Sequence, residues 1–163
     1  MTRAFMSPMV YTFVRCSLGL VFVYSGVMKL LDLQGFASVI EAYGLIPWQF
    51  KSFAALVIAS TEAVAGTGLL LDLKGSLAVV VVMLAVFMAV LGFGIHMGYD
   101  IDCGCFGEDD PVGQAMHGLG QALIRDVVFC AGAFYCYTWR YRLGHRPVSL
   151  MARIRQITKN KER

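Results

Sequence analysis

Charge is scarce in this sequence, and its scarcity argues against a soluble fold. Charged residues make up 15% of the 163 residues, hydrophobic residues make up 58%, and the mean hydropathy is +0.65. An average soluble domain carries about 25% charged residues. The sequence also lacks a C-x-x-C pair, a glycine-rich phosphate loop, a G-x-S-x-G motif and an H-E-x-x-H motif. Nucleotide and hydrolase chemistry therefore have no support from motifs.

Long apolar runs are what the sequence has instead. A helix needs about 20 mostly apolar residues to cross the hydrocarbon core of a bilayer. Four segments reach this length, at residues 8–31, 52–71, 76–97 and 119–139. Short connections between successive spans favour antiparallel neighbours. The sequence therefore predicts an all-α integral membrane protein, with an antiparallel four-helix transmembrane bundle within residues 1–139.

The segment between the first two spans is long enough for a helix of its own. We expect a short helix from Gln34 to Ala42 that lies at the extracytoplasmic interface, and Pro47 should break it before the second span. Glycines within the spans should let the helices approach closely. These glycines are Gly19, Gly26, Gly66, Gly68, Gly92 and Gly94.

The distribution of charge outside the spans predicts the orientation. Residues 140–163 form a tail rich in Lys and Arg, whereas residues 98–118, between the third and fourth spans, carry only acidic charges. Segments rich in Lys and Arg that lie close to the end of a membrane span usually stay in the cytoplasm. We therefore expect a bacterial inner-membrane protein with both termini cytoplasmic and the 98–118 loop extracytoplasmic. Beside a membrane span, such a tail is typical of contact with anionic lipid rather than with nucleic acid.

Five charged residues fall within or near the predicted spans: Arg15, Lys29, Glu62, Arg125 and Asp126. Such residues are costly in hydrocarbon and usually face the interior of a bundle. Glu62 is expected near the midplane, where it must be paired, protonated or hydrated. Lys29 and Arg125 should lie in the outer half, where each can pair with a carboxylate or reach the loop above. These five residues predict buried ion pairs that hold the helices together, a supporting role at a redox or ligand site, or both. Arg15 is expected to be structural.

Two cysteines one glycine apart, Cys103 and Cys105, interrupt the acidic loop. Gly104 relaxes the backbone, and a disulfide closed over so short a ring would be labile and oxidising. Thiol–disulfide exchange is therefore the leading interpretation. Capture of a soft metal such as Cu(I), with His96 and His117 as further ligands, is an alternative. A structural turn or intermolecular staple is the third.

The other cysteines, Cys16, Cys130 and Cys136, lie in predicted spans, where an isolated cysteine usually behaves as a small apolar residue. Cys16 and Cys136 are expected at a similar depth toward the cytoplasm. A second dithiol there is a further alternative.

Several segments resemble one family of membrane proteins. They are "RCSLGLVFVYSGVMKLLD" at residues 15–32, "FASVIEAYGLIP" at 36–47, Glu62, "CGCFG" at 103–107 and "LIRD" at 123–126. Together they are similar to the MauE branch of the DoxX-like membrane proteins, over most of the chain from about Val14 to Trp139. The CGCFG element after three spans is the most specific part, because the opening segment is shared with the wider DoxX-like group.

This resemblance implies a four-helix membrane protein tied to disulfide metabolism outside the cytoplasm. The family's named member is associated with maturation of methylamine dehydrogenase, a disulfide-rich periplasmic enzyme, alongside a thioredoxin-like partner. Other relatives are thought to accompany thioredoxin-like proteins or to pass electrons between thiols and quinone. By position, Cys103 and Cys105 would be the redox pair. The supporting polar set would be Arg15, Lys29, Glu62, Arg125 and Asp126.

The sequence thus predicts a membrane thiol–disulfide redox protein that acts on a separate periplasmic thioredoxin-like or substrate protein, with a quinone as a candidate electron acceptor. Two alternatives come from other classes. One is a metal-binding or transport module that uses the cysteine pair. The other is a non-catalytic membrane subunit that anchors a redox partner. The direction of electron flow is left open at this point.

Overall fold

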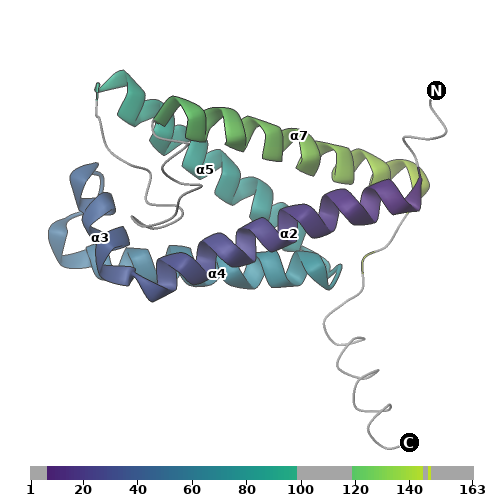
Figure 1. Cartoon of the computed structure of the whole chain (residues 1–163), viewed down its shortest axis with the longest axis horizontal. Helices are drawn as coiled ribbons and strands as arrows, with labels where there is room; N and C mark the ends of the chain where they lie inside the picture. The colour runs from purple at the N-terminus through teal and green to yellow at the C-terminus, as the bar shows by residue number, and fades with distance from the viewer. Residues whose placement is uncertain (1–6, 99–118, 145–146, 148–163) are drawn as a thin grey trace, which may run out of the picture.

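The structure is a computed structural model that describes residues 7–98, 119–144 and 147. Its described part consists of helices and the turns between them (Figure 1). The elements are α2 (Pro8–Leu31), α3 (Leu33–Ala42), the 3-10 helix η1 (Trp48–Phe50), α4 (Lys51–Leu70), α5 (Ser76–His96) and α7 (Leu119–Leu143). Helices α2, α4, α5 and α7 are each long and apolar enough to cross a membrane. The predicted all-α fold with four spans is confirmed.

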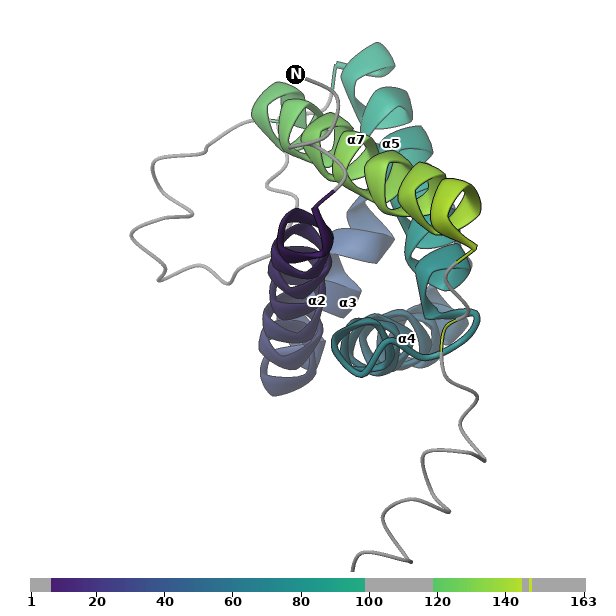
Figure 2. The ribbon, with the colours of Figure 1, turned by 90° about the vertical axis from the view of Figure 1, so that its right-hand side faces the viewer.

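The four long helices run alternately up and down and surround a common interior (Figures 1 and 2). Contacts join α2 to α4, α4 to α5, α5 to α7 and α7 back to α2. At one end of the bundle, here called the α3 end, α3 lies with the last turns of α5 and the first turns of α7 (Figure 1). At the opposite end, here called the turn end, the α4–α5 turn lies with the start of α2 and the end of α7.

Local sequence signals explain where the first helices begin and end. Ser7 accepts a hydrogen bond from the Met9 amide, and Pro8 occupies the first helical turn, where its missing N–H costs nothing. Asp32 ends α2 and caps α3, because its carboxylate accepts a 2.9 Å hydrogen bond from the Gly35 amide. The predicted short helix is thus confirmed, one residue longer at its start. It ends at Ala42, before Pro47, because Gly44 takes a left-handed conformation with φ of +63°.

The fourth long helix extends further than predicted. Helix α7 continues to Leu143, although the sequence predicted the span to end at Trp139 and a tail to begin at residue 140. The helix continues because Arg140 points inward and donates a hydrogen bond to Asp72 in the α4–α5 turn. The α4–α5 turn itself closes with Asp72 at φ +54° and Gly75 at φ +95°.

Three of the predicted glycines hold α2 against α4. A Cβ added at Gly26 would lie 2.6 Å from the Ala63 backbone nitrogen, and one at Gly66 would lie 2.7 Å from the Val23 nitrogen. Gly19 lies against Gly66 and Leu70 in the same seam. Small residues in transmembrane helices permit this backbone contact.

The other predicted glycines differ from one another. Gly94 lies against Tyr43 and Leu119 at the α3 end, and Gly68 lies against Ser76 across the α4–α5 turn. The expectation for Gly92 was wrong, since a Cβ there would have no described atom within 4 Å. Gly92 lies on a face of α5 that none of the described helices covers closely.

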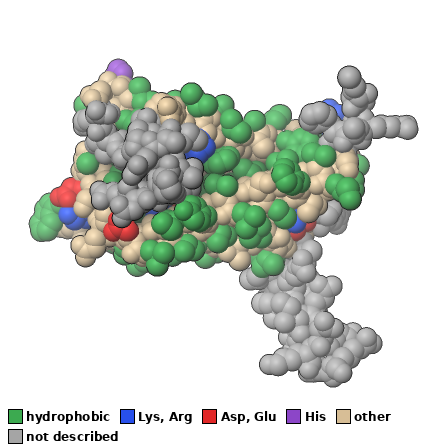
Figure 3. Space-filling model, in the orientation of Figure 1, with side chains coloured by type: hydrophobic (Ala, Val, Ile, Leu, Met, Phe, Trp, Pro, Cys, Tyr) green, Lys and Arg blue, Asp and Glu red, His purple; other side chains and the backbone are tan. Residues whose placement is uncertain are grey.

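On the face of the bundle in Figure 3, hydrophobic side chains are spread along the length of the helices. Large hydrophobic side chains point outward from the helices, such as Phe13 at 74%, Val64 at 71% and Phe134 at 71% exposure. A surface of this kind is stable in lipid rather than in water. The chain is therefore a multi-pass membrane protein.

The α2–α4 seam yields a stability prediction. Gly26→Ala should lower the free energy of unfolding in detergent micelles by about 1–3 kcal/mol, because the new methyl group meets backbone atoms that cannot move aside. Gly92→Ala is the matched control and should leave stability unchanged or slightly raised, because alanine favours helix. Equal stability of the two variants, measured by denaturant titration with circular dichroism, would contradict the close backbone contact between α2 and α4.

Candidate functional site: a buried charge network at the α3 end

An ion pair between Lys29 of α2 and Glu62 of α4 lies in the centre of the site. Lys29 Nζ donates a 2.6 Å hydrogen bond to Glu62 Oε2, and the two side chains are only 1% and 4% exposed. Inside a membrane protein, neither charge can be satisfied by bulk water. Each therefore depends on the other for its stability.

The helix directions bring the two side chains together. A helical side chain leans toward the N-terminus of its own helix. Helices α2 and α4 run in opposite directions, so Lys29, in the last turn of α2, leans inward from the α3 end. Glu62, near the middle of α4, leans outward toward the same end. The long lysine side chain spans the remaining distance.

Two aromatic rings also lie close to the Lys29 ammonium. Its Nζ lies 4.6 Å from the ring centroid of Phe87 on α5 and 5.1 Å from that of Phe36 on α3. A desolvated ammonium over a ring face gains about 2 kcal/mol or more. Lys29 thus contacts three elements besides its own, namely α3, α4 and α5.

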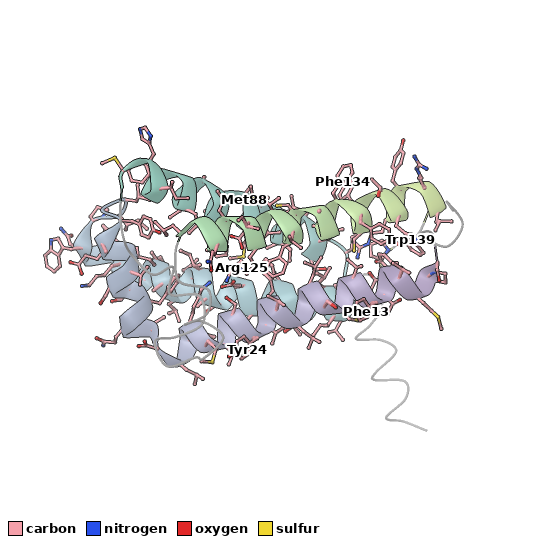
Figure 4. The ribbon with its side chains drawn as sticks, turned by 45° about the horizontal axis from the view of Figure 1, so that its top comes forward. Phe13, Tyr24, Met88, Arg125, Phe134 and Trp139 are labelled. Carbon is pink, nitrogen blue, oxygen red and sulfur yellow. The ribbon has the colours of Figure 1, made fainter. Side chains whose placement is uncertain are left out.

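A second pair of charges comes from the start of α7. Arg125 Nε and a terminal guanidinium nitrogen of Arg125 each lie 3.3 Å from Asp126 Oδ1. Arg125 points into the bundle (Figure 4), and its side chain is 16% exposed. The other carboxylate oxygen, Asp126 Oδ2, is buried and has no hydrogen-bond donor among the described residues. Asp126 is therefore only half satisfied by the described part of the chain.

The two pairs meet at a small polar cavity of about 20 Å³. Glu62, Arg125, Asp126 and Ser25 line it, together with apolar side chains. A cavity of about 10–15 Å³ by this measure holds one water, provided that two to four polar groups surround it. This cavity meets both conditions, so a water can join the two pairs into one network. With all four groups ionised, the two cations and two anions of the network balance.

A larger cavity of about 180 Å³ lies on the other side of Lys29 and Asp126. Helix α3, the α3–η1 connection, α4 and α5 supply its walls, which are apolar apart from Tyr43 and these two charged residues. Phe36 and Phe87, whose rings hold Lys29, are among the wall residues. Asp126 lines both cavities.

The structure therefore brings four of the five predicted intramembrane charges together and separates the fifth. Arg15 lies toward the turn end, where it donates hydrogen bonds to the backbone oxygens of Leu69 and Leu70, the latter at 2.7 Å. A cation at the C-terminal carbonyls of α4 also interacts favourably with the helix dipole. This geometry is what the expected structural role requires.

The predicted loop residues have a different outcome. Cys103, Cys105 and His117 lie outside the described residues. His96 is described, and it is exposed at the end of α5. No group of three or more His, Cys, Asp or Glu side chains that could hold a metal is present in residues 7–98 and 119–144. The metal alternative gains no support from the described part of the chain.

The three cysteines within the spans are free thiols. Cys136 is buried in the main apolar core, and Cys16 is only partly buried. Cys130 donates a 3.5 Å hydrogen bond to the Met88 sulfur across the α5–α7 contact.

The sequence reasoning missed a polar cluster at the turn end. Arg140 donates to Asp72 Oδ1 at 2.6 Å and to the Tyr11 hydroxyl at 2.9 Å, and Tyr11 donates to Asp72 at 3.0 Å. The Tyr11 ring also stacks on Trp139, with centroids 4.1 Å apart (Trp139 is labelled in Figure 4). The sequence signal for this cluster was Asp72, an acidic residue in the short turn between the second and third spans, together with the basic end of the fourth span. The partner of Asp72 was predicted to belong to the tail.

The Lys29–Glu62 pair yields the second prediction. Glu62→Gln should lower the free energy of unfolding in micelles by about 3–5 kcal/mol, because it leaves the buried ammonium without its anion. The double variant Lys29→Met, Glu62→Met should recover most of that loss, since it removes both charges. Denaturant titrations of the two variants check this, and a double variant no more stable than the single one would show that the pair is not the source of the effect.

Comparisons with known proteins identify the family. The family model for methylamine utilisation protein MauE matches residues 7–138. A curated relative from Paracoccus denitrificans, named methylamine utilization protein MauE, is 34% identical over 110 residues, which cover 64% of this chain. The aligned region spans 59% of the length of that relative. No solved structure matches the chain. The match over residues 7–138 covers the first three spans, most of the fourth and the charge network, and the chain belongs to the MauE family.

Proposed function

We propose that this protein is a membrane thiol–disulfide redox protein whose Cys103–Cys105 pair exchanges a disulfide with a partner dithiol. The observation that carries the proposal is the buried charge network at the α3 end. Such a network is costly to build within a membrane, and intramembrane ionisable groups usually mark a functional site.

The chain connects the network to the cysteine pair. Helix α5 ends and α7 begins at the α3 end (Figure 1), so residues 99–118 leave from this end and return to it. Cys103 follows Gly98 closely in the sequence, and an extended chain spans only about 3.3–3.6 Å per residue. This connectivity supports the proposal that the cysteine pair works next to the end of the bundle that holds the charges.

The proposed exchange proceeds in two displacements. A partner thiolate attacks one sulfur of the Cys103–Cys105 disulfide, which breaks that bond and forms a mixed disulfide. The partner's second thiolate then displaces the sulfur of this chain, and the partner leaves with a disulfide. Two electrons pass to Cys103 and Cys105, and the two protons lost by the partner's thiols equal the two taken up by the new thiols. A membrane quinone, as the co-substrate, would take up these two electrons and two protons as the disulfide forms again.

The charge network supplies the exchange with a cation that can stabilise a thiolate. A cation close to a thiol stabilises the thiolate that must form or leave. Arg125, near the start of α7, is the cation of the network whose helix leads directly from the cysteine segment. The acidic residues around the cysteines disfavour a thiolate, so a buried cation offsets them.

We place the cysteine pair outside the cytoplasm and both termini inside, in a bacterial inner membrane, on the basis of the basic tail and the acidic loop. Disulfides persist in that outer compartment. The partner is then a separate periplasmic thioredoxin-like or substrate protein. The Paracoccus relative is named for methylamine utilisation, and we propose the same metabolic context for this chain.

Replacement of single cysteines tests the redox role. Cys103→Ser and Cys105→Ser should each abolish oxidation of reduced thioredoxin by the purified protein in nanodiscs with added quinone, because one thiol cannot close a disulfide. Cys16→Ser is the matched control and should keep the activity, since Cys16 lies on α2 toward the turn end. Full activity in both loop variants would instead favour a non-catalytic subunit.

Labelling of intact cells tests the orientation. After mild reduction, a membrane-impermeant maleimide should label the protein in whole cells, and the Cys103→Ser, Cys105→Ser double variant should lose this label. Labelling that requires broken membranes would reverse the proposed topology.

A further inference from the structure

The 180 Å³ cavity has a polar end that the fold leaves incompletely used. Lys29 carries three N–H donors, and one hydrogen bond, to Glu62, is present among the described residues. Asp126 Oδ2 is buried without a described donor, and its side chain is 5% exposed. Both residues line the cavity, so its charged end combines an ammonium that makes one described hydrogen bond with a carboxylate that has one oxygen without a described donor.

The rest of the lining is apolar and partly aromatic. Phe36 and Phe87 flank Lys29, and Val90 and Ile58 belong to the wall. Water would satisfy the charged end but would leave the apolar walls facing water. A hydrocarbon chain would fill the walls but would leave the buried charged groups unsatisfied. The lining fits a ligand with a flat apolar body and oxygen atoms at its edge.

The size and position of the cavity restrict the choice of ligand further. Pockets that enclose whole drug-sized ligands have about 300–1,000 Å³, so about 180 Å³ is enough for a ring but not for a long attached chain. Val86 and Leu45 line the cavity and are 53% and 51% exposed. Val86 lies near the middle of a membrane-spanning helix, so an opening beside it faces lipid, where an attached chain can remain.

We propose that this cavity binds the ring of a lipid-soluble quinone. A quinone oxygen accepts a hydrogen bond from Lys29, and in the hydroquinone form a hydroxyl donates one to Asp126. The choice of a quinone among flat, oxygen-bearing lipophiles rests on the proposed redox function, whereas the cavity and its charged end rest on the geometry alone.

Binding is best measured in a protein that cannot perform thiol exchange. We would use the Cys103→Ser, Cys105→Ser variant in detergent micelles, with empty micelles as the blank. The probes are duroquinone, whose fully substituted ring does not add thiols, and hexamethylbenzene, which has the same ring size without oxygen. Titration calorimetry should show duroquinone binding about tenfold or more tightly than hexamethylbenzene, as expected for a hydrogen bond to a charged group.

Two variants with a matched control locate the site. Val90→Trp fills the cavity and should abolish binding of duroquinone, whereas Val82→Trp, on the outward face of the same helix at 61% exposure, should not. Lys29→Met with Glu62→Met should remove the preference for duroquinone over hexamethylbenzene.

Three results would overturn the proposal: equal binding of the two probes, duroquinone binding unchanged by Val90→Trp, or a preference that survives loss of the ion pair. A chain that binds duroquinone at this site but does not oxidise thioredoxin with intact cysteines would refute the redox function and retain the ring site. The reverse pattern would retain the redox function and refute the ring site.

Discussion

Most of the α3 end depends on one constraint, which is that a charge inside a bilayer must find its counter-charge within the protein. The 2.6 Å bond between Lys29 and Glu62 meets this requirement. It requires α2 and α4 to stay close, and the glycine seam at Gly26 and Gly66 permits that approach. It also fixes α3 and α5, because their aromatic rings contact the same ammonium. The position of the two cavities follows from this pair.

The two ends of the bundle satisfy their buried polar groups to different degrees. At the turn end, Asp72 accepts from both Arg140 and Tyr11, and these three side chains join α2, the α4–α5 turn and α7. At the α3 end, Asp126 Oδ2 has no donor and Lys29 makes one hydrogen bond among the described residues, and both residues line the large cavity. A satisfied polar cluster rigidifies a fold, whereas a partly satisfied one is costly unless a ligand or water completes it. The contrast fits a structural role for the turn end and the proposed chemistry at the α3 end.

The sequence could predict the elements of this fold better than the contacts between them. Hydrocarbon thickness sets the length of a span, so four apolar runs were enough to find the four long helices. The cost of intramembrane charge also identified Lys29, Glu62 and Asp126 as interior residues. It could not say that Lys29 pairs with Glu62 rather than with Asp126, because that choice depends on which helices are adjacent and how far each side chain leans. Arg140 was assigned to a tail for the same reason, since its acceptor lies 68 positions away in the chain. The cysteine pair lies outside the described residues, and its role stays a prediction.

Asp126 connects the proposed redox exchange to the proposed ring site, because it lines both the small polar cavity and the large one. Oxidation of a dithiol to a disulfide releases two electrons and two protons, and reduction of a quinone to a hydroquinone takes up the same number of each. The overall transfer therefore needs no proton from bulk water, but it needs a group that can carry protons between a thiol above and a ring beneath. A carboxylate with one oxygen bound to Arg125 and the other without a described donor suits that task.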